Sequence, residues 1–173
     1  DIMLSHKDYR DAMSIRMVVE KCINEATANV YAFMHKGYAR CFDSFENFVK
    51  YSFELLDYDV AIQLFNDDYQ IYTRTRNTPP AIYAPTAKVK NSFIANGSKI
   101  AGQVENSIIS RYVEIEEGAR VKNSILLTKT IVKKGSVVEN AVVDKYALID
   151  GEIKGTKSSP KYVAQGKKIS KWK

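Results

Sequence analysis

Large aliphatic residues recur along residues 89–149 at steps of five or six positions, with a single step of four. This spacing fits neither the 3.6-residue period of a helix nor the two-residue period of a strand. It is typical of a coil of short strands that turns a corner about every six residues and closes one turn with three strands. We therefore predict a parallel β-helix whose core contains Val89, Ile94, Ile100, Val104, Ile109, Ile115, Val121, Leu126, Val132, Val138, Val143 and Ile149.

Small residues occupy a second series of positions, each two residues before a core position. Ten of these twelve residues are Ala, Ser or Gly, which suits the restricted space beside a corner of the coil. The span from Val89 to Ile149 corresponds to about three and a half turns.

A six-residue phrase repeats within this region as "VKNSFI", "VENSII", "VKNSIL" and "VENAVV". Stacked turns place its copies above one another at about 4.8 Å. We predict that their asparagines form a ladder near one corner, where Asn tolerates left-handed backbone and its amide can pair with the next turn. These residues are Asn91, Asn106, Asn123 and Asn140.

A column of alternating charge accompanies the asparagines: Lys90, Glu105, Lys122 and Glu139. Opposite charges on neighbouring strands attract, and a slip in register would break their order. We interpret both columns as devices that stabilise the coil and fix its register.

The first eighty residues follow other patterns. Apolar residues at helical spacing predict a helix over residues 9–26, and two short apolar runs around "HKG" predict paired strands at 29–34 and 38–42. A capping signal, Asp43 followed by Glu46, predicts a helix over residues 44–56, and a shorter helix is expected at 59–65. These elements together indicate a small α+β segment.

Two prolines in "NTPP" mark a linker, because proline fixes an extended path and ends strand pairing. We expect an α+β segment at residues 1–76, the linker at 77–84, the β-helix at 85–150 and a basic tail at 151–173. The tail is expected to cap the last turn, with "KYVAQGKKI" as one more strand and Trp172 over apolar surface.

Composition narrows the functional classes. Seven lysines and no acidic residue lie at residues 154–173, so the net charge of +6 belongs to this tail and the first 153 residues carry −1. Without a surface of stacking aromatics, this charge does not indicate a nucleic-acid-binding protein. Two cysteines, Cys22 and Cys41, indicate a reducing compartment, and the lack of a signal peptide or membrane span favours the cytoplasm. The absence of Met at position 1 suggests a piece of a longer protein.

Two quoted stretches carry a resemblance. "GYARCFDSFENFVKYSFELLD" begins at Gly37, and "IYTRTRNTPPAIYAPTAKVKNSFIANGSKI" begins at Ile71 and leads into the repeats. In this order they resemble the C-terminal portion of bacterial glucose-1-phosphate adenylyltransferase, or ADP-glucose pyrophosphorylase, and within that family its GlgD-type subunit. The resemblance covers residues 36–155.

The resemblance implies a left-handed β-helix preceded by the end of a nucleotidyltransferase domain. The family makes ADP-glucose and pyrophosphate from ATP and glucose 1-phosphate with Mg²⁺ in glycogen biosynthesis. Its Gly-rich phosphate-binding loop has no counterpart here, because the glycines are scattered. We therefore expect this stretch alone to be non-catalytic and to hold no cofactor or metal.

A "GYWxDxG" motif of catalytic members aligns with Gly37 to Asp43. Cys41 stands where the metal-binding Asp belongs, and a thiol is a poor Mg²⁺ ligand. The resemblance thus implies a GlgD-like subunit with weak or no catalysis. The alternative is that Asp43 supplies the carboxylate from a shifted position.

The family's β-helix supports oligomerisation and helps to frame pockets for sugar-phosphate activators and AMP. Arg111 matches an Arg-bearing turn of that β-helix, and Arg74 and Arg76 at the linker are chosen by chemistry and position, because the guanidinium binds phosphate through two hydrogen bonds. The expected partners are a second copy of the chain, a catalytic adenylyltransferase subunit, or both. No membrane or nucleic-acid partner is expected.

Other functions use the same coil. A hexapeptide-repeat acyltransferase needs a His between coils, and a carbonic anhydrase of this fold needs three His ligands for zinc. His6 and His35 both precede the predicted β-helix, which disfavours these two enzymes. A pure oligomerisation module remains as an alternative.

Overall fold

The computed structural model describes residues 15–65, 70–72 and 77–170. The chain forms two compact units, Asp1–Lys36 and Gly37–Lys173. No helix within these described residues is long and apolar enough to cross a membrane.

In the first unit, helix α2 (Ile15–Asn24) buries Val18 and Cys22 one turn apart. Helix α2 ends at Asn24, two residues before the predicted end at residue 26. Residues 9–14 of the predicted helix lie outside the described residues. The two strands predicted at 29–34 and 38–42 are wrong, because residues 29–42 have no regular structure. Tyr31, Phe33 and Met34 are exposed there, and an isolated pair of strands without a covered face is marginally stable.

The second unit begins with helices α3 (Phe45–Glu54) and α4 (Tyr58–Leu64). Ser44 caps α3, since its hydroxyl accepts a hydrogen bond from the Asn47 amide at 3.1 Å. The predicted cap, Asp43, instead accepts a hydrogen bond from the Asn47 side chain at 2.7 Å. Asp57 caps α4 through the Asp59 amide.

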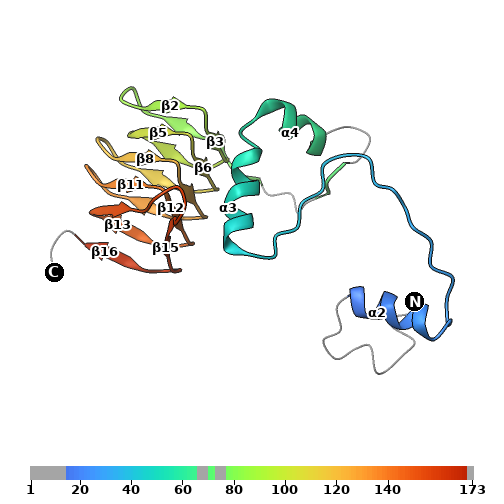
Figure 1. The fold of residues 1–173 in the computed structure, drawn as a ribbon. Coiled ribbons are helices and arrows are strands. Elements are labelled where there is room, and N and C mark those ends of the chain that lie inside the picture. The colour runs from blue at the N-terminus through green and yellow to red at the C-terminus, as the bar shows by residue number, and fades with distance from the viewer. Residues whose placement is uncertain (1–14, 66–69, 73–76, 171–173) are drawn as a thin grey trace. The chain divides into compact units, whose positions relative to one another are not determined.

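The described residues contain sixteen short strands in three parallel sheets, and the chain visits the sheets in strict rotation (Figure 1). Sheet A contains β1 (Ile82–Tyr83), β4 (Lys99–Ile100), β7 (Glu114–Ile115), β10 (Ile131–Val132), β13 (Leu148–Asp150) and β16 (Lys168–Ser170). Sheet B contains β2 (Lys88–Lys90), β5 (Gln103–Glu105), β8 (Arg120–Lys122), β11 (Val137–Glu139) and β14 (Glu152–Lys154). Sheet C contains β3 (Phe93–Ile94), β6 (Ile108–Ile109), β9 (Ile125–Leu126), β12 (Ala141–Val143) and β15 (Lys161–Val163).

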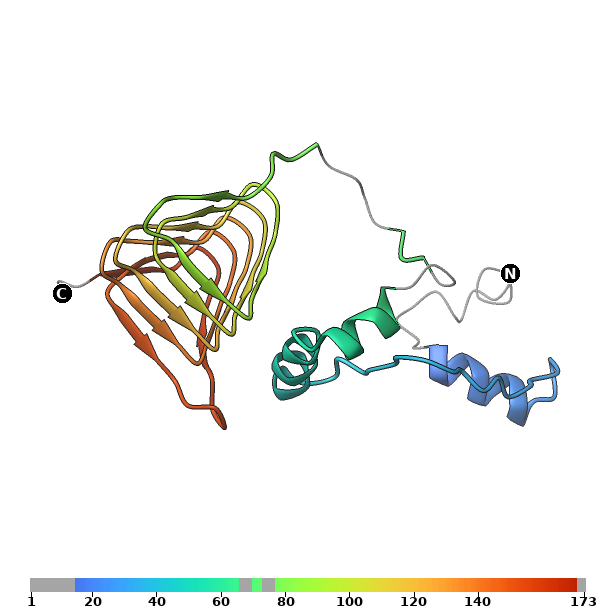
Figure 2. The same cartoon turned by 90° about the horizontal axis from the view of Figure 1, so that it is seen from above.

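These strands form a left-handed β-helix, and Figure 2 shows its three-sided outline along the axis. The predicted fold class is confirmed. The β-helix is longer than the predicted range of 85–150: β1 starts at Ile82 and β16 ends at Ser170. The coil therefore makes about five turns rather than three and a half. The tail at 151–173 contains three strands, β14, β15 and β16, where we expected one, and Trp172 lies outside the described residues.

The core is the column of inward aliphatics. From Ile100 to Ile149 every predicted core residue is at most 2% exposed, and Ile94 is partly buried against them. Val89 was predicted as core but is 38% exposed, because it lies in the first coil, where no further strand of sheet B covers it. Ile153 and Val163 of the tail join the same column.

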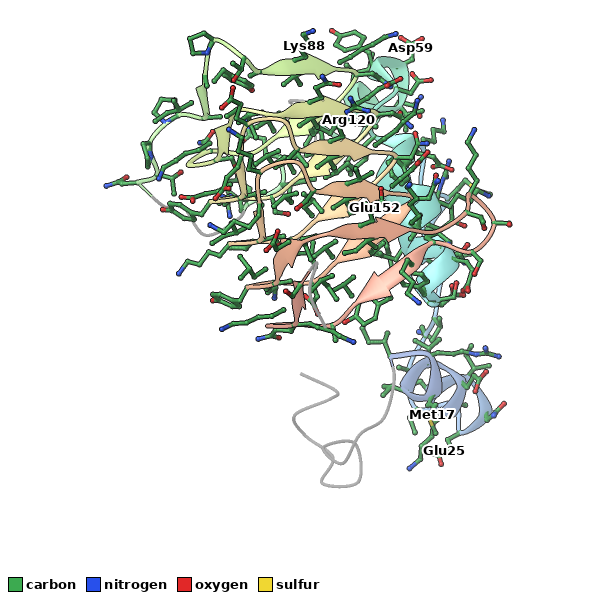
Figure 3. The ribbon with its side chains drawn as sticks, turned by 90° about the vertical axis from the view of Figure 1, so that its left-hand side faces the viewer. Met17, Glu25, Asp59, Lys88, Arg120 and Glu152 are labelled. Atoms are coloured by element: carbon green, nitrogen blue, oxygen red, sulfur yellow. The ribbon has the colours of Figure 1, made fainter. Side chains whose placement is uncertain are left out.

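The outward faces carry ordered charges. Lys88, Arg120 and Glu152 lie on sheet B and follow one column along the axis (Figure 3). Lys122 pairs with Glu105 of the preceding coil at 3.4 Å. Near another corner, the Lys133 ammonium donates a hydrogen bond to Glu116 and holds the pKa of that carboxyl below its ordinary value.

Val138 and Val89 occupy the same column of sheet B but differ in burial, which makes a matched pair for testing the core. We expect Val138→Ala to lower the free energy of unfolding by roughly 2 kcal/mol, because Val138 is fully buried. Val89→Ala should cost less than about 1 kcal/mol. Equal losses in urea unfolding would contradict this account of the core.

Candidate functional site

The corner between sheets B and C is built on asparagine. Asn91, Asn106, Asn123 and Asn140 have φ angles of 42–48° and lie one above another. Each amide group donates to the next carboxamide oxygen, at 3.0 Å, 2.7 Å and 3.3 Å along the column, and Asn140 donates to the Gly155 carbonyl at 3.3 Å. The column is therefore a continuous ladder of hydrogen bonds.

Serine follows asparagine at this corner and links the coils. The Ser107 hydroxyl donates to the Glu105 carbonyl at 2.7 Å and accepts the Ser124 amide at 3.1 Å. Ser124 does the same with Lys122 and with the Ala141 amide. Both serines are fully buried, so these bonds satisfy polar groups that cannot reach water.

The regular corner ends at the fifth coil. One residue, Asn140, separates β11 from β12, whereas six residues separate β14 from β15, from Gly155 to Pro160. Gly155 takes the ladder position, and the extra residues form a turn in which Thr156 and Ser159 exchange backbone and side-chain hydrogen bonds. Figure 2 shows this loop projecting beyond the outline of the other coils.

The outward face of sheet C is apolar over all five coils. Its residues are Phe93, Ile108, Ile125, Val142 and Tyr162. Ile125 and Val142 are each 2% exposed although they point away from the core, because α3 lies against this face (Figure 1). This column was not predicted, although an apolar residue directly precedes the inward one in every copy of the repeated phrase.

Phe45 of α3 contacts Tyr162 of β15 and so links the helix to the coil. Their rings meet edge to face at 5.9 Å between centroids. The Tyr162 hydroxyl donates to Asp144 at 2.9 Å, and this hydrogen bond raises the pKa of Tyr162. The hydrogen bond is therefore complete below the ordinary tyrosine pKa of about 10 and is lost as the pH rises through the folded value.

A groove of about 290 Å³ lies between α3, the asparagine ladder and the inserted loop. Its apolar wall contains Val49, Phe53 and Pro160, and its polar residues are Glu46, Lys50, Asn106, Asn123, Asn140, Thr156, Lys157 and Ser158. Within the described residues, neither Lys50 nor Lys157 forms an ion pair. We call this the α3–ladder groove. It gathers donors and positive charge against an apolar wall.

The predicted metal-site position does not fit Mg²⁺. Cys41 is an exposed thiol, and Asp43 is hydrogen bonded to Asn47. The nearby Glu54 carboxylate accepts hydrogen bonds from Arg40 at 2.8 Å and Tyr38 at 3.3 Å. Among the described residues, no three His, Cys, Asp or Glu side chains come together as a metal site.

Arg111 lies at a different corner, exposed beside Tyr112. Tyr112, Lys129 and Tyr146 stack there in left-handed backbone with φ of 59–61°, and the Lys129 ammonium lies 5.5 Å from the Tyr146 ring centroid. The structure does not bring Arg111 to the α3–ladder groove. Arg74 and Arg76 lie outside the described residues.

Comparisons with known proteins agree on one group of relatives. The family described as "GlmU-like, C-terminal hexapeptide" matches residues 82–156. The glycogen biosynthesis protein GlgD of Bacillus subtilis is 31% identical over 168 residues, which are 96% of this chain and 48% of GlgD. GlgD of Geobacillus stearothermophilus is 50% identical over 70 residues, covering 40% of this chain and 20% of that protein.

A glucose-1-phosphate adenylyltransferase from Fervidobacterium nodosum is 35% identical over 124 residues, covering 72% of this chain and 30% of the enzyme. The chain thus spans about half the length of the Bacillus subtilis relative and less of the enzyme.

Asn123 tests the two roles of the corner separately. Asn123→Gly keeps the left-handed backbone and removes the ladder bonds, so we expect a loss of about 1 kcal/mol in unfolding free energy. Asn123→Ala should lose about 1 kcal/mol more, because its Cβ disfavours this conformation. Asn96→Ala, at an exposed position that lacks a positive φ, should change little. Equal stability of the Gly and Ala variants would refute the backbone argument.

The contact between the Phe45 and Tyr162 rings should hold α3 against the β-helix. Trypsin cleavage after Lys50 reports opening of the helix when opening is fast relative to cleavage. Phe45→Ala and Tyr162→Ala should each speed this cleavage at least about 2-fold, since an aromatic pair contributes roughly 0.5–1.5 kcal/mol beyond its buried area. Tyr162→Phe keeps the ring and should cleave nearly as slowly as the original chain. Tyr146→Ala is the control, and a rate as fast as that of Phe45→Ala would exclude a specific contact.

Proposed function

We propose, since this chain is a relative of GlgD and of the glucose-1-phosphate adenylyltransferases, that it is the C-terminal regulatory and assembly region of a subunit of that enzyme family and acts in glycogen biosynthesis. One observation carries the proposal. The similarity to GlgD extends over 96% of the chain and so includes α3 as well as the β-helix.

The whole protein would belong to an enzyme that makes ADP-glucose and pyrophosphate from ATP and glucose 1-phosphate with Mg²⁺. This stretch would not perform that reaction. Its scattered glycines provide no phosphate-binding loop, and Cys41 replaces an oxygen ligand with a thiol that Mg²⁺ binds poorly. These features support a GlgD-like subunit with weak or no catalysis.

The ends of the β-helix support a role in assembly. In sheets B and C the first strands, β2 and β3, pair on one edge alone within the described residues. Ile82, Tyr83, Val89 and Phe93 expose apolar surface at the same end. Unpaired strand edges beside apolar side chains favour contact with another protein surface. A second copy or a catalytic subunit is the partner that we propose.

A hexapeptide-repeat acyltransferase is the competing enzyme class. The β-helix from Ile82 to Ser170 contains no histidine, so the general base of those enzymes has no counterpart on this coil. An assembly module without a regulatory role is the other alternative, and activity measurements with effectors separate it from our proposal.

The whole subunit should be tested for ADP-glucose synthesis, alone and mixed with a catalytic adenylyltransferase subunit, with and without sugar phosphates and AMP. We expect little activity alone and a changed rate or effector response in the mixture. The variant Cys41→Asp restores the metal ligand of the family. It should raise ADP-glucose synthesis if the thiol is what weakens Mg²⁺ binding. Full activity of the unaltered subunit alone would contradict the proposal, and so would the absence of any effect on the partner.

A further inference from the structure

We propose that three residues before α3 form a latch, which transmits the docking of α3 on the coil to position 41. The residues are Tyr38, Arg40 and Phe42, and we call them the Arg40 latch. The importance of position 41 rests on the proposed function, because the resemblance to the adenylyltransferases places the metal-binding Asp of catalytic members there. The latch contacts themselves do not depend on that function, and they act on position alone.

Arg40 is the centre of the latch. Its Nε donates a hydrogen bond to the Glu54 carboxylate at 2.8 Å, and the Tyr38 hydroxyl donates to the same oxygen atom at 3.3 Å. The guanidinium carbon of Arg40 lies 4.6 Å from the Tyr38 ring centroid and 5.5 Å from that of Tyr51. A guanidinium that pairs with a carboxylate and lies over aromatic rings is held in one orientation. Arg40 therefore ties the segment before α3 to the last residue of that helix.

Phe42 ties the segment to α3 on the other side of Cys41. Its ring meets the Tyr51 ring edge to face at 5.8 Å between centroids, and it meets the Phe48 ring at 6.3 Å. Alternate residues from Tyr38 onward thus contact the helix, whereas Cys41 between two of them is exposed. The segment has no regular structure, so these side-chain contacts fix the place of Cys41 relative to α3.

Helix α3 lies between the coil and the latch. The α3 residues that contact Tyr162 or line the groove with the ladder include Phe45, Val49 and Phe53. The α3 residues that contact the latch are Phe48, Tyr51 and Glu54. At about 100° per residue these two sets lie on nearly opposite sides of the helix. One helix therefore touches the coil with one side and the latch with the other.

This arrangement gives a continuous physical chain from the coil to position 41. Tyr162 of β15 contacts Phe45 at the start of α3, and Glu54 at the end of α3 holds Arg40, the neighbour of Cys41. Packed side chains and rigid helices carry energetic coupling between distant positions. A change in how α3 sits on the coil should therefore displace or loosen Cys41. In the whole subunit, the β-helix would thereby influence the place of residue 41.

A nitroxide label on Cys41 of the 173-residue chain tests the latch by electron paramagnetic resonance, since Cys41 is exposed and Cys22 is buried. Arg40→Gln and Glu54→Gln should each raise the ratio of mobile to ordered label at least about 2-fold, because each variant breaks the ion pair. Arg40→Lys keeps the charge and should give an intermediate ratio. Arg16→Gln is the matched control, because it breaks the Arg16–Glu20 pair on α2, and it should leave the label unchanged.

Transmission from the coil is measured with the same label. Tyr162→Ala should raise the ratio of mobile to ordered label at least about 2-fold, because the aromatic contact that holds α3 is lost. Tyr146→Ala removes an exposed ring from another corner of the coil and should not change the ratio. A label that responds to Arg40→Gln but not to Tyr162→Ala would overturn the proposed transmission.

Two further results would overturn the latch itself: an unchanged label in both Arg40→Gln and Glu54→Gln, or an equal response to Arg16→Gln. Trypsin cleavage after Arg40 is a second measurement, made without the label in the Glu54→Gln variant. Cleavage should be faster than in the original chain when opening is fast relative to cleavage, and an equal rate would contradict the latch. These measurements involve neither catalysis nor a partner subunit, so failure of the latch and failure of the proposed function give different results.

Discussion

The β-helix depends on the sharp corner between sheets B and C. Each of the first four coils turns there within one or two residues, and one of these is an asparagine in left-handed backbone. The same asparagines bond to one another along the axis, and the serine hydroxyls that follow the first three of them tie the first four coils together. A residue chosen for its backbone conformation therefore also fixes the register that brings the aliphatic side chains into one core.

The coil has two apolar surfaces with different tasks. Its inner column holds the turns together, whereas the outward face of sheet C holds α3. Because α3 precedes the linker in sequence and packs on the coil in space, the two sides of the linker are mechanically connected. In the fifth coil an inserted loop replaces the regular corner. The α3–ladder groove lies between α3, the asparagine ladder and this loop. The inserted loop between β14 and β15, which breaks the regular corner, therefore lies at the same place as the groove.

Much of the β-helix was predictable because every coil places the same requirements on its inward and corner residues. Inward positions must be aliphatic and corner positions must tolerate left-handed backbone, so spacing alone identified the residues from Ile100 to Ile149. The last turns were missed because the loop after Gly155 interrupts the spacing. Val89 looks identical to Val138 in sequence, and only its place in the end coil exposes it. The groove was not predictable, because its lining residues Lys50 and Lys157 are far apart in the chain and belong to one groove only because α3 packs on the coil. The false strands at 29–42 show the converse limit, since local apolar runs do not reveal whether any face will cover them.

The central claim is that α3 and the β-helix form one cooperative body in which the groove is preformed. Amide hydrogen exchange of the intact chain tests this most directly, because protection reports how much structure must open before an amide meets solvent. We predict that the α3 amides exchange far more slowly than those of α4, because Phe45 of α3 contacts Tyr162 of the coil and α3 lines the groove, whereas no α4 residue lines it. We also expect the α3 amides to be protected together with those of β9 and β12 of sheet C. Rapid exchange throughout α3, with the β-helix still protected, would contradict the claim.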